Sequence, residues 1–313
     1  MQSNNKFTYR FCLLVHNRFE LAKVALNSLL NQTIVDFDVY VSDNSDDPSF
    51  SDYIKEICFD HSNLHYIYRN ATLNGIEHIN KVINESLNYD FFMIFHDDDI
   101  LHDNYFETII KLDEINDINL SAIAINAVVL NKYVVSNKKI TNYNSNRKVV
   151  SKLNLIDTYF CFDSNGAPPF PGYLYRSSLI KDVRLHIENG GKHSDLPFLT
   201  DLLSNGYFLW LDKPLMSYRI HESNDSKLYS EVDREKLYNY LIKNHILSSD
   251  AKTDFHFAII IEKYKNKIIR KNLFYFFLLK YMIKAIFEMR FIHILTVQLH
   301  KLINSQTIRR VRN

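Results

Sequence analysis

The sequence predicts an α/β protein with a mostly parallel sheet covered by helices and a helical C-terminal region. Four short apolar runs between residues 11 and 95 alternate with segments whose apolar residues recur at helical spacing. This alternation is typical of strand–helix–strand units, in which neighbouring strands are parallel. Polar or charged residues follow each run directly. Parallel sheets bind ligands beyond the carboxyl ends of their strands, so these polar residues are the first candidates for a site.

The first predicted strand covers residues 11–15 and ends at His16, Asn17 and Arg18. A helix is expected next, because Asn17 can cap its first turn and Glu20 follows three residues later. The apolar residues of this helix recur at helical spacing: Leu21, Val24, Ala25, Leu26, Leu29 and Leu30.

The second and third predicted strands cover residues 38–42 and 64–68. They end at Asp43 and Arg69, respectively. Two more helices are expected after these strands, over residues 51–58 and from Gly75 onward. Because the carboxyl ends of parallel strands share one edge of the sheet, we expect Asp43 and Arg69 near the residues that follow the first strand.

The fourth predicted strand covers residues 91–95 and leads into three consecutive carboxylates, Asp97, Asp98 and Asp99. An uninterrupted apolar run of this length indicates a strand that is buried on both faces. Three like charges repel one another unless a positive partner lies among them, and a hard divalent cation prefers carboxylate oxygens. A cation that also held a diphosphate would help a phosphate-ester leaving group to depart. The alternative is a solvated acidic turn before the next helix.

The second half of the chain continues the alternation less regularly. A helix is expected over 105–115, and strands are expected over 122–129, 132–135, 173–175, 207–211 and 216–220. Residues 137–147 are polar and turn-rich, and 167–172 form a proline-rich loop. A glycine-containing segment leads to Asp195, and Pro197 suits the first turn of a helix that Gly206 would end.

Composition indicates a globular protein, with 46% hydrophobic and 23% charged residues in a chain of 313. The three cysteines are scattered singly and form no disulfide framework. Reduced thiols and the absence of a recognisable signal peptide predict a cytoplasmic location.

Charge divides the chain near residue 227. Residues 1–226 carry a net charge of −9, and residues 227–313 carry +10. We therefore expect a catalytic domain over 1–226 and a basic, aromatic-rich helical region over 227–313. The acidic front part argues against nucleic-acid binding. Two readings of the C-terminal region stay open, a helical appendage packed on the catalytic domain or a helix lying on an anionic membrane surface.

Six short motifs in this order resemble glycosyltransferase family 2, the inverting enzymes of the GT-A, Rossmann-like fold, and especially bacterial ones that build O-antigen or capsule polysaccharide. The resemblance covers about residues 7–226. The motifs are Val15–Arg18 with Ser28–Thr33, Val41–Ser45, Asn74-Gly75 through Asn80, Asp97–Asp99, Ser194-Asp195 with Phe198, and Tyr218–His221 with Ser223-Asn224.

The resemblance implies a nucleotide-sugar donor, usually a UDP sugar, held with Mn²⁺ or Mg²⁺ at a DXD-type motif. It implies that Asp99 and His221 bind the metal. The donor nucleotide would be contacted by His16, Asn17, Arg18, Asp43, Arg69, Asp97 and Asp98. Asp43 would accept a hydrogen bond from the base, although Asp43 alone is equally a turn residue after a strand.

The same resemblance gives Asp195 the role of general base, which takes the proton of the acceptor hydroxyl during inversion. Relatives usually carry Glu-Asp where this chain has Ser194-Asp195. Without the resemblance, Asp195 could equally cap the helix that follows it.

The expected enzyme is a hexosyl- or N-acetylhexosaminyltransferase that extends a lipid-linked surface glycan. It would work as a peripheral protein on the inner face of the cytoplasmic membrane. One alternative is a sugar-nucleotide nucleotidyltransferase, which is disfavoured because no glycine-rich basic loop follows the first strand. The other is an inactive membrane-bound homologue that acts as a scaffold.

Overall fold

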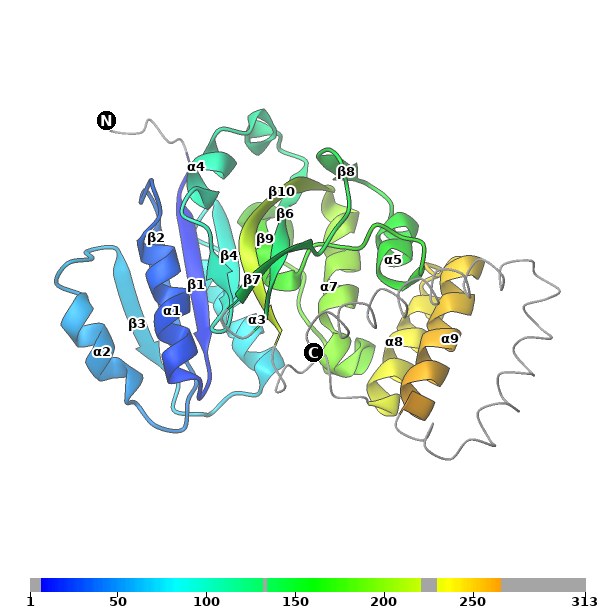
Figure 1. Cartoon of the computed structure of the whole chain (residues 1–313), viewed down its shortest axis with the longest axis horizontal. Helices are drawn as coiled ribbons and strands as arrows, with labels where there is room; N and C mark the ends of the chain where they lie inside the picture. The colour runs from blue at the N-terminus through cyan, green and yellow to red at the C-terminus, as the bar shows by residue number, and fades with distance from the viewer. Residues whose placement is uncertain (1–6, 132–133, 221–229, 266–313) are drawn as a thin grey trace, which may run out of the picture. The chain divides into compact units, whose positions relative to one another are not determined.

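The computed structural model describes residues 7–131, 134–220 and 230–265 (Figure 1). The chain divides into two compact units. The larger contains the described residues up to Leu155 and from Gly166 to Ile246, and the smaller contains residues 156–165 and those from Leu247 onward. The change in charge at residue 227 falls within the larger unit, and the division into 1–226 and 227–313 stays a prediction.

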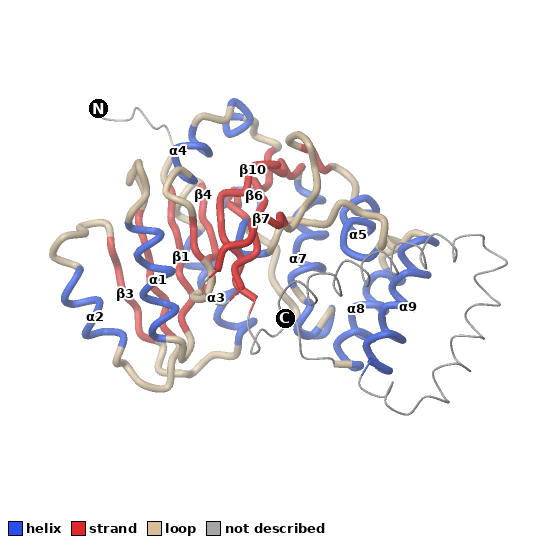
Figure 2. Tube along the Cα trace, viewed as in Figure 1, coloured by secondary structure: helices blue, strands red, loops and turns tan. Residues whose placement is uncertain are grey.

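The larger unit is built on one sheet, whose ten described strands include four parallel neighbours in the order β3-β2-β1-β4 (Figure 2). These are β1 (Tyr9–Val15), β2 (Asp38–Asp43), β3 (Leu64–Tyr68) and β4 (Phe91–His96). All four predicted strands are therefore confirmed, and so is the parallel arrangement that aligns their carboxyl ends.

The sheet continues beyond β4 in the order β9-β6-β10-β5. Strand β9 (Tyr173–Arg176) runs antiparallel to both β4 and β6 (Leu120–Asn131), and β6 runs parallel to β10 (Tyr207–Ile220). Residues 207–211 and 216–220 were expected as separate strands, but they form the single strand β10 with register shifts around Pro214. A proline has no N–H for the ladder, which explains the irregularity at this point.

Three short strands complete the sheet: β5 (Ile100–Leu101), β7 (Val134–Lys139) and β8 (Arg147–Val149). Strand β8 begins at Arg147, the last residue of the region expected to be polar and turn-rich, and it pairs with β10. The described helices are α1 (Phe19–Leu30), α2 (Phe50–Ile57), α3 (Gly75–Ser86), α4 (Tyr105–Ile110), α5 (Lys152–Phe160), α6 (Ser177–Ile180), α7 (Asp195–Leu202), α8 (Glu231–Lys243) and α9 (Ser249–Lys265). The helix expected over 105–115 stops at Ile110 and is followed by a short 3₁₀ turn at Asp113–Asn116.

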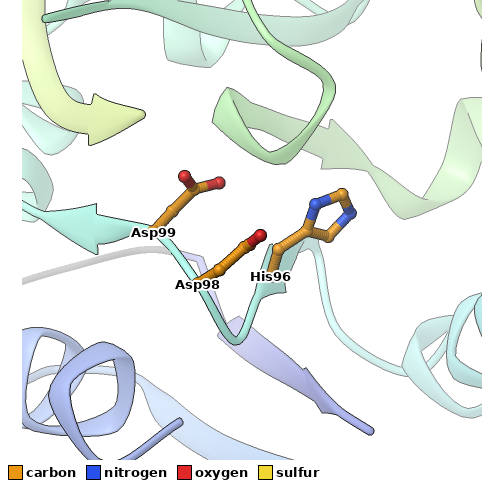
Figure 3. A group of neighbouring side chains, drawn as sticks. All are labelled: His96, Asp98 and Asp99. Carbon is orange, nitrogen blue, oxygen red and sulfur yellow. The ribbon is translucent and has the colours of Figure 1, made fainter. Parts of the chain in front are cut away.

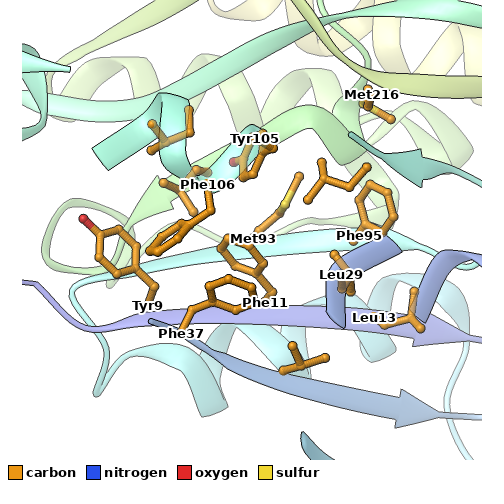
Figure 4. Close-up of a cluster of buried hydrophobic side chains, with 14 of the residues drawn as sticks. Tyr9, Phe11, Leu13, Leu29, Phe37, Met93, Phe95, Tyr105, Phe106 and Met216 are labelled. Carbon is orange, nitrogen blue, oxygen red and sulfur yellow. The ribbon is translucent and has the colours of Figure 1, made fainter. Parts of the chain in front are cut away.

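The main hydrophobic core lies on the face of the sheet covered by α1 and α4 (Figure 4). Alternate residues of β1 and β4 point into it, among them Phe11 and Met93. The ring of Phe11 stacks on Phe37 with 4.3 Å between centroids and meets Phe106 edge to face. The ring of Phe91 stacks on Tyr9, so aromatic packing also helps to fix β4, which carries the carboxylates.

The other residues of β1 and β4 are buried on the opposite face. Cys12 lies 3.5 Å from the hydroxyl of Ser86 in α3, and Phe92 packs against Tyr175 of β9. Tyr175 in turn meets Phe198 of α7 edge to face. Both faces of β4 are therefore buried, as its apolar sequence predicts, and the second face connects β4 to the helix that begins with Asp195.

The N-terminus of α1 corrects one expectation. Asn17 does not cap the helix, because Arg18 occupies the N-cap position and forms no side-chain cap bond. Asn17 instead adopts a left-handed backbone conformation with φ 56°. Its amide exchanges two hydrogen bonds with Asp46, so it joins the loop after β1 to the loop after β2. Asparagine is one of the few residues that accept this conformation at low energetic cost.

The smaller unit is held together by contacts around α9. The ring of Phe160 meets Phe255 edge to face at 4.7 Å, and Ser248 donates a hydrogen bond to Asp157. Among the helices of the described ranges, none is both long enough and apolar enough to cross a bilayer. The apolar stretches at 273–279, 281–283 and 291–297, on which the membrane prediction rests, lie outside the described residues.

Candidate active site

The loops after β1, β2 and β4 meet at the carboxyl edge of the sheet. The backbone N–H of His16 donates to Asp97 Oδ2 at 3.0 Å, and the His16 ring nitrogen Nδ1 lies 2.9 Å from the carbonyl oxygen of Asn44. The N–H of Asn17 donates to the hydroxyl of Ser45 at 2.9 Å. The side chains of His16 and Asn17 are exposed, so a ligand can reach them above this edge.

The three carboxylates at the end of β4 are buried, with Asp97 1%, Asp98 6% and Asp99 1% exposed. The guanidinium of Arg18 forms ion pairs with Asp97 and with Asp98, the latter at 2.8 Å. Buried carboxylates are stable only with such partners. The solvated acidic turn that the sequence left as an alternative is therefore wrong.

Arg219 of β10 braces the same turn from the other side. Its backbone N–H donates to Asp99 Oδ1 at 2.8 Å, and its Nε donates to the carbonyl oxygen of Asp98 at 2.7 Å. The side chain is 6% exposed. Sequence reasoning noticed Arg219 within a motif but did not count it as a site residue, because only the strand order shows that β10 reaches the acidic turn.

The segment that follows the carboxylates is held by the last turns of α1 and the residues just after it. Ser28 accepts a hydrogen bond from the N–H of Leu101 at 3.0 Å. The amide of Gln32 donates to the carbonyl of His102 at 2.8 Å and accepts from the N–H of Phe106 at 3.1 Å. Ser28 and Gln32, both in the Ser28–Thr33 motif, thus fix the backbone that follows the carboxylates.

The acidic turn can hold a divalent cation. One ligand atom from each of His96, Asp98 and Asp99 lies within 4.8 Å of the others (Figure 3). Asp99 Oδ2 is buried and has no hydrogen-bond partner among the described residues. Burial and the charge of Asp98 raise the pKa of Asp99 well above its usual value, and burial raises the pKa of Asp97 to about 6. A cation at this point would satisfy the unpaired oxygen, and two carboxylates with an imidazole are a ligand set that divalent metals accept.

Asp43 is fully buried at the end of β2, and both of its carboxylate oxygens accept hydrogen bonds. Oδ2 accepts from the hydroxyl of Tyr66 at 2.8 Å, and Oδ1 accepts from the N–H of Ser45 at 3.0 Å. The second bond is the turn contact that an aspartate after a strand commonly forms. A ligand N–H that approached Asp43 would therefore share Oδ2 with the Tyr66 hydroxyl.

Arg69 follows β3, but its guanidinium points into the protein. The side chain is 10% exposed and forms an ion pair with Glu85 of α3 at 2.5 Å. Its Nε also donates to the hydroxyl of Ser42 at 3.1 Å, and that hydroxyl lies 2.8 Å from Nε2 of His78. The structure thus places the charge of Arg69 beneath the edge of the sheet, in contact with α3, rather than among the residues above it.

Asp195 is the first residue of α7, and Ser194 occupies the N-cap position. Asp195 therefore does not cap this helix. The approach to it is fixed by Asn80, whose side chain forms two hydrogen bonds with the backbone of Leu185, and by Gly191. Gly191 has φ +57°, a conformation that favours glycine, and a Cβ there would lie 1.8 Å from the carboxylate of Asp233 unless that side chain moved.

The carboxyl group of Asp195 is only partly exposed, and burial raises its pKa to about 6. The N–H groups of Asp195 and Leu196 oppose this shift by hydrogen bonding to the charged form. Burial, together with the charges of Asp99, Asp98 and Asp195, raises the pKa of the Tyr218 hydroxyl to about 12, so Tyr218 lies near both Asp195 and the acidic turn. A carboxylate whose pKa lies near 6 is suited to accept a proton at neutral pH.

The structure therefore brings together most of the predicted site residues: His16, Asn17, Arg18, Asp43, Asp97, Asp98 and Asp99. Asp195 lies within electrostatic reach of the same turn through Tyr218. Arg69 is directed elsewhere, and His221 lies outside the described residues. His96, to which sequence reasoning gave no role, belongs to the acidic group.

Comparisons with known proteins agree with the fold. Residues 11–166 match the family model described as glycosyl transferase family 2. No curated protein matches the chain in a sequence search. Among solved structures, TarS 1-349 of S. aureus in complex with UDP-GlcNAc is 17% identical with a TM-score of 0.58, over 82% of this chain and 73% of that chain.

Two further structures have the same architecture. The mannosyltransferase PcManGT of Pyrobaculum calidifontis, in complex with GDP-Man and Mn²⁺, is 10% identical with a TM-score of 0.54, over 82% of this chain and 72% of that chain. GalNAc-T7 with UDP, GalNAc and Mn²⁺ is 10% identical with a TM-score of 0.58, over 81% of this chain and 50% of that chain. At these identities the likeness establishes the fold, which is the predicted α/β GT-A fold.

Proposed function

We propose that the protein is an inverting, metal-dependent glycosyltransferase of family 2, whose family model matches residues 11–166. The observation that carries the proposal is the buried carboxylate group at the end of β4, in which Asp99 keeps an oxygen without a hydrogen-bond partner among the described residues. A buried, unpaired carboxylate oxygen is costly for a fold unless a cation binds it. The donor we propose is a nucleotide sugar, with UDP as the first candidate nucleotide.

The donor lies along the carboxyl edge of the parallel strands in this proposal. The exposed side chains of His16 and Asn17 contact the nucleoside, and Asp43 accepts a hydrogen bond from the base alongside the Tyr66 hydroxyl. Arg18, whose side chain is 35% exposed, keeps Asp97 and Asp98 in place and presents its outer edge to the donor. Arg69 supports this edge from below through Glu85 and Ser42.

Asp99 and His221 would hold the cation, Mn²⁺ or Mg²⁺, as the family resemblance implies. We add Asp98, which the resemblance assigns to the donor nucleotide, because one of its carboxylate oxygens lies within 4.8 Å of one of Asp99. When bound, the cation supplies positive charge that stabilises the departing nucleoside diphosphate. Arg219 keeps both residues in position, because it binds the carboxylate of Asp99 and the carbonyl of Asp98.

Asp195 is the general base of the proposed reaction. Its carboxylate removes the proton of the acceptor hydroxyl while that oxygen attacks the anomeric carbon on the side opposite the leaving diphosphate. One new C–O bond forms, one C–O bond to phosphate breaks, and the proton passes to Asp195. With a pKa of about 6, Asp195 is ionised at neutral pH and can accept it.

The acceptor we propose is a growing, lipid-linked surface glycan of the O-antigen or capsule type, and the transferred sugar is a hexose or an N-acetylhexosamine. We place the enzyme on the inner face of the cytoplasmic membrane. The support is the sequence of residues 263–313, which contain 12 Lys and Arg and one acidic residue among many aromatic ones. Such segments are attracted to anionic lipid surfaces.

The experiment that tests the reaction is a panel of UDP- and GDP-sugars incubated with Mn²⁺ and scored for nucleotide release. We expect release from one donor class with the wild-type protein and none with Asp99→Ala. Release that persists with Asp99→Ala, or that needs no divalent cation, contradicts the proposed role of the acidic turn.

A separate experiment tests the location. The full-length protein is floated with vesicles of phosphatidylglycerol or of phosphatidylcholine alone. We expect flotation with the anionic vesicles only, reduced at high salt because screening weakens the attraction. A protein that stays at the bottom of both gradients contradicts the membrane part of the proposal and leaves the reaction unaffected.

A further inference from the structure

We propose that His96 is a protein ligand of the cation at the acidic turn and that its imidazole makes this site prefer Mn²⁺ to Mg²⁺. The inference rests on the proposed function, because it concerns the same cation. It adds a ligand to Asp98, Asp99 and His221, and it gives the site a metal preference.

The first line of support for His96 as a ligand is its position. It is the last residue of β4, and it is partly exposed whereas the five residues before it are buried. The chain turns directly after it, so the carboxylates of Asp98 and Asp99 and the ring of His96 lie around one space (Figure 3). A ligand that enters this space can therefore reach all three side chains.

The second line of support is the distances between the three ligand atoms. The three ligand atoms lie within 4.8 Å of one another. Two ligands on opposite sides of a small octahedral cation are about 4.2 Å apart, since each bond is about 2.1 Å long. Small rotations of the side chains are therefore enough to bring all three atoms onto one ion.

The third line of support for His96 as a ligand is the charge and hydrogen bonding of the carboxylates. Asp99 Oδ1 already accepts from the N–H of Arg219, whereas Oδ2 is buried and has no hydrogen-bond partner within the described ranges. Asp98 Oδ2 is shared with Arg18 at 2.8 Å. The carboxylates alone thus offer few oxygens to a cation, and a nitrogen from His96 fills a position that they leave open.

The metal preference follows from the kind of donor atom. Mg²⁺ binds oxygen ligands and keeps most of its water, whereas first-row transition ions gain affinity from an imidazole nitrogen. A site with His96 in its ligand set therefore favours Mn²⁺ more than the same site without it. A purely structural role, such as packing near the ring of Phe170 at 6.3 Å between centroids, gives no such preference.

The test measures metal binding directly, without turnover. Affinities for Mn²⁺ and Mg²⁺ are determined by calorimetry and by the electron paramagnetic resonance signal of free Mn²⁺ in the presence of UDP. The variants are His96→Ala and His96→Asp, with His65→Ala as a control on β3, where the histidine side chain is 42% exposed. Thermal unfolding of each variant verifies that it is folded.

We expect His96→Ala to weaken Mn²⁺ binding about tenfold or more and Mg²⁺ binding less than about threefold. His96→Asp should restore Mg²⁺ binding better than Mn²⁺ binding, because it offers oxygen in place of nitrogen. The electron spin echo modulation from imidazole nitrogen on bound Mn²⁺ should become shallower in His96→Ala. The control should match the wild type in every measurement.

Equal losses of Mn²⁺ and Mg²⁺ affinity in His96→Ala, or unchanged nitrogen modulation, overturn the inference. Asp99→Ala separates this failure from failure of the proposed function. If Asp99→Ala abolishes Mn²⁺ binding while His96→Ala does not, the metal site stands and His96 is not a ligand. If neither variant affects Mn²⁺ binding, the cation does not bind at this turn at all.

Discussion

Replacing the proposed base by its amide should make the protein more stable at neutral pH and inactive. In the folded chain burial raises the pKa of Asp195 to about 6, against an ordinary value of 3.8. The folded state therefore binds this proton more tightly than the unfolded state. Its contribution to stability is fully present below pH 3.8 and is lost as the pH rises through about 6. Asp195→Asn stays neutral at every pH and avoids this loss.

The magnitude follows from the pKa shift. A difference of roughly 2 units corresponds to about 3 kcal/mol above pH 6. Since the side chain is partly exposed, solvent reduces the effect, and we expect about 1–3 kcal/mol in favour of Asp195→Asn at pH 8. The negative charge also interacts favourably with the N-terminus of α7, but this contributes only about 0.3–1 kcal/mol. The burial penalty is therefore the larger effect.

The measurement is urea unfolding of the wild type and Asp195→Asn at pH 8 and at pH 4.5, without nucleotide or metal. The difference in the free energy of unfolding should be largest at pH 8 and shrink at pH 4.5. Asp201→Asn is the matched control on the same helix. It weakens a hydrogen bond from the Tyr240 hydroxyl, which is 2.6 Å long, so it should destabilise the protein.

The same substitution should also change the activity of the enzyme. Asp195→Asn should lose transfer while keeping UDP and Mn²⁺ binding within about threefold of the wild type, and the wild-type rate should fall about tenfold for each pH unit below 6. A variant that is less stable than the wild type at pH 8, with a difference that does not change with pH, refutes the reasoning about burial. A variant that loses UDP binding as severely as Asp99→Ala refutes the assignment of Asp195 as base.

Three further substitutions test the supports of the site. Asp99→Ala should abolish both transfer and metal-dependent UDP binding, as measured by calorimetry with and without Mn²⁺. Arg69→Met should lower the free energy of unfolding by about 3 kcal/mol, because it leaves Glu85 without its closest partner, and should leave UDP affinity unchanged; lost UDP affinity with intact stability would instead place Arg69 at the donor. Arg219→Ala should cost about 1–3 kcal/mol in urea unfolding and weaken Mn²⁺ binding, since the backbone of Asp98 loses its buried donor; unchanged Mn²⁺ affinity would count against this bracing role.

The parallel core of the fold was predictable because each of its strands can be recognised from the apolar run of its own residues. Apolar runs such as 91–95 are buried on both faces, and helices with clear periodicity separate them. The same local reasoning located the acidic turn and the residues after β1. It failed where pairing with a distant strand decides the structure, as for β8, and where β10 continues past Pro214.

The acidic part of the candidate site was predictable from the sequence. The residues that hold it in place were harder to predict. Asp97–Asp99 stand out as consecutive charges after an apolar strand. Arg69 looked equally available to a ligand, but the direction of its guanidinium depends on Glu85, which lies on a neighbouring helix. Arg219 and His96 carried no local signal of their roles, because those roles depend on strand order and on the turn at residues 97–99.

The central claim is that a cation and the diphosphate of a nucleotide bind at the carboxyl end of β4. Anomalous diffraction from crystals soaked with UDP and Mn²⁺ tests it most directly. We expect the manganese peak between the carboxylates of Asp98 and Asp99, with the diphosphate bound to it. A manganese peak and nucleotide density found together at any other place on the molecule would contradict the account.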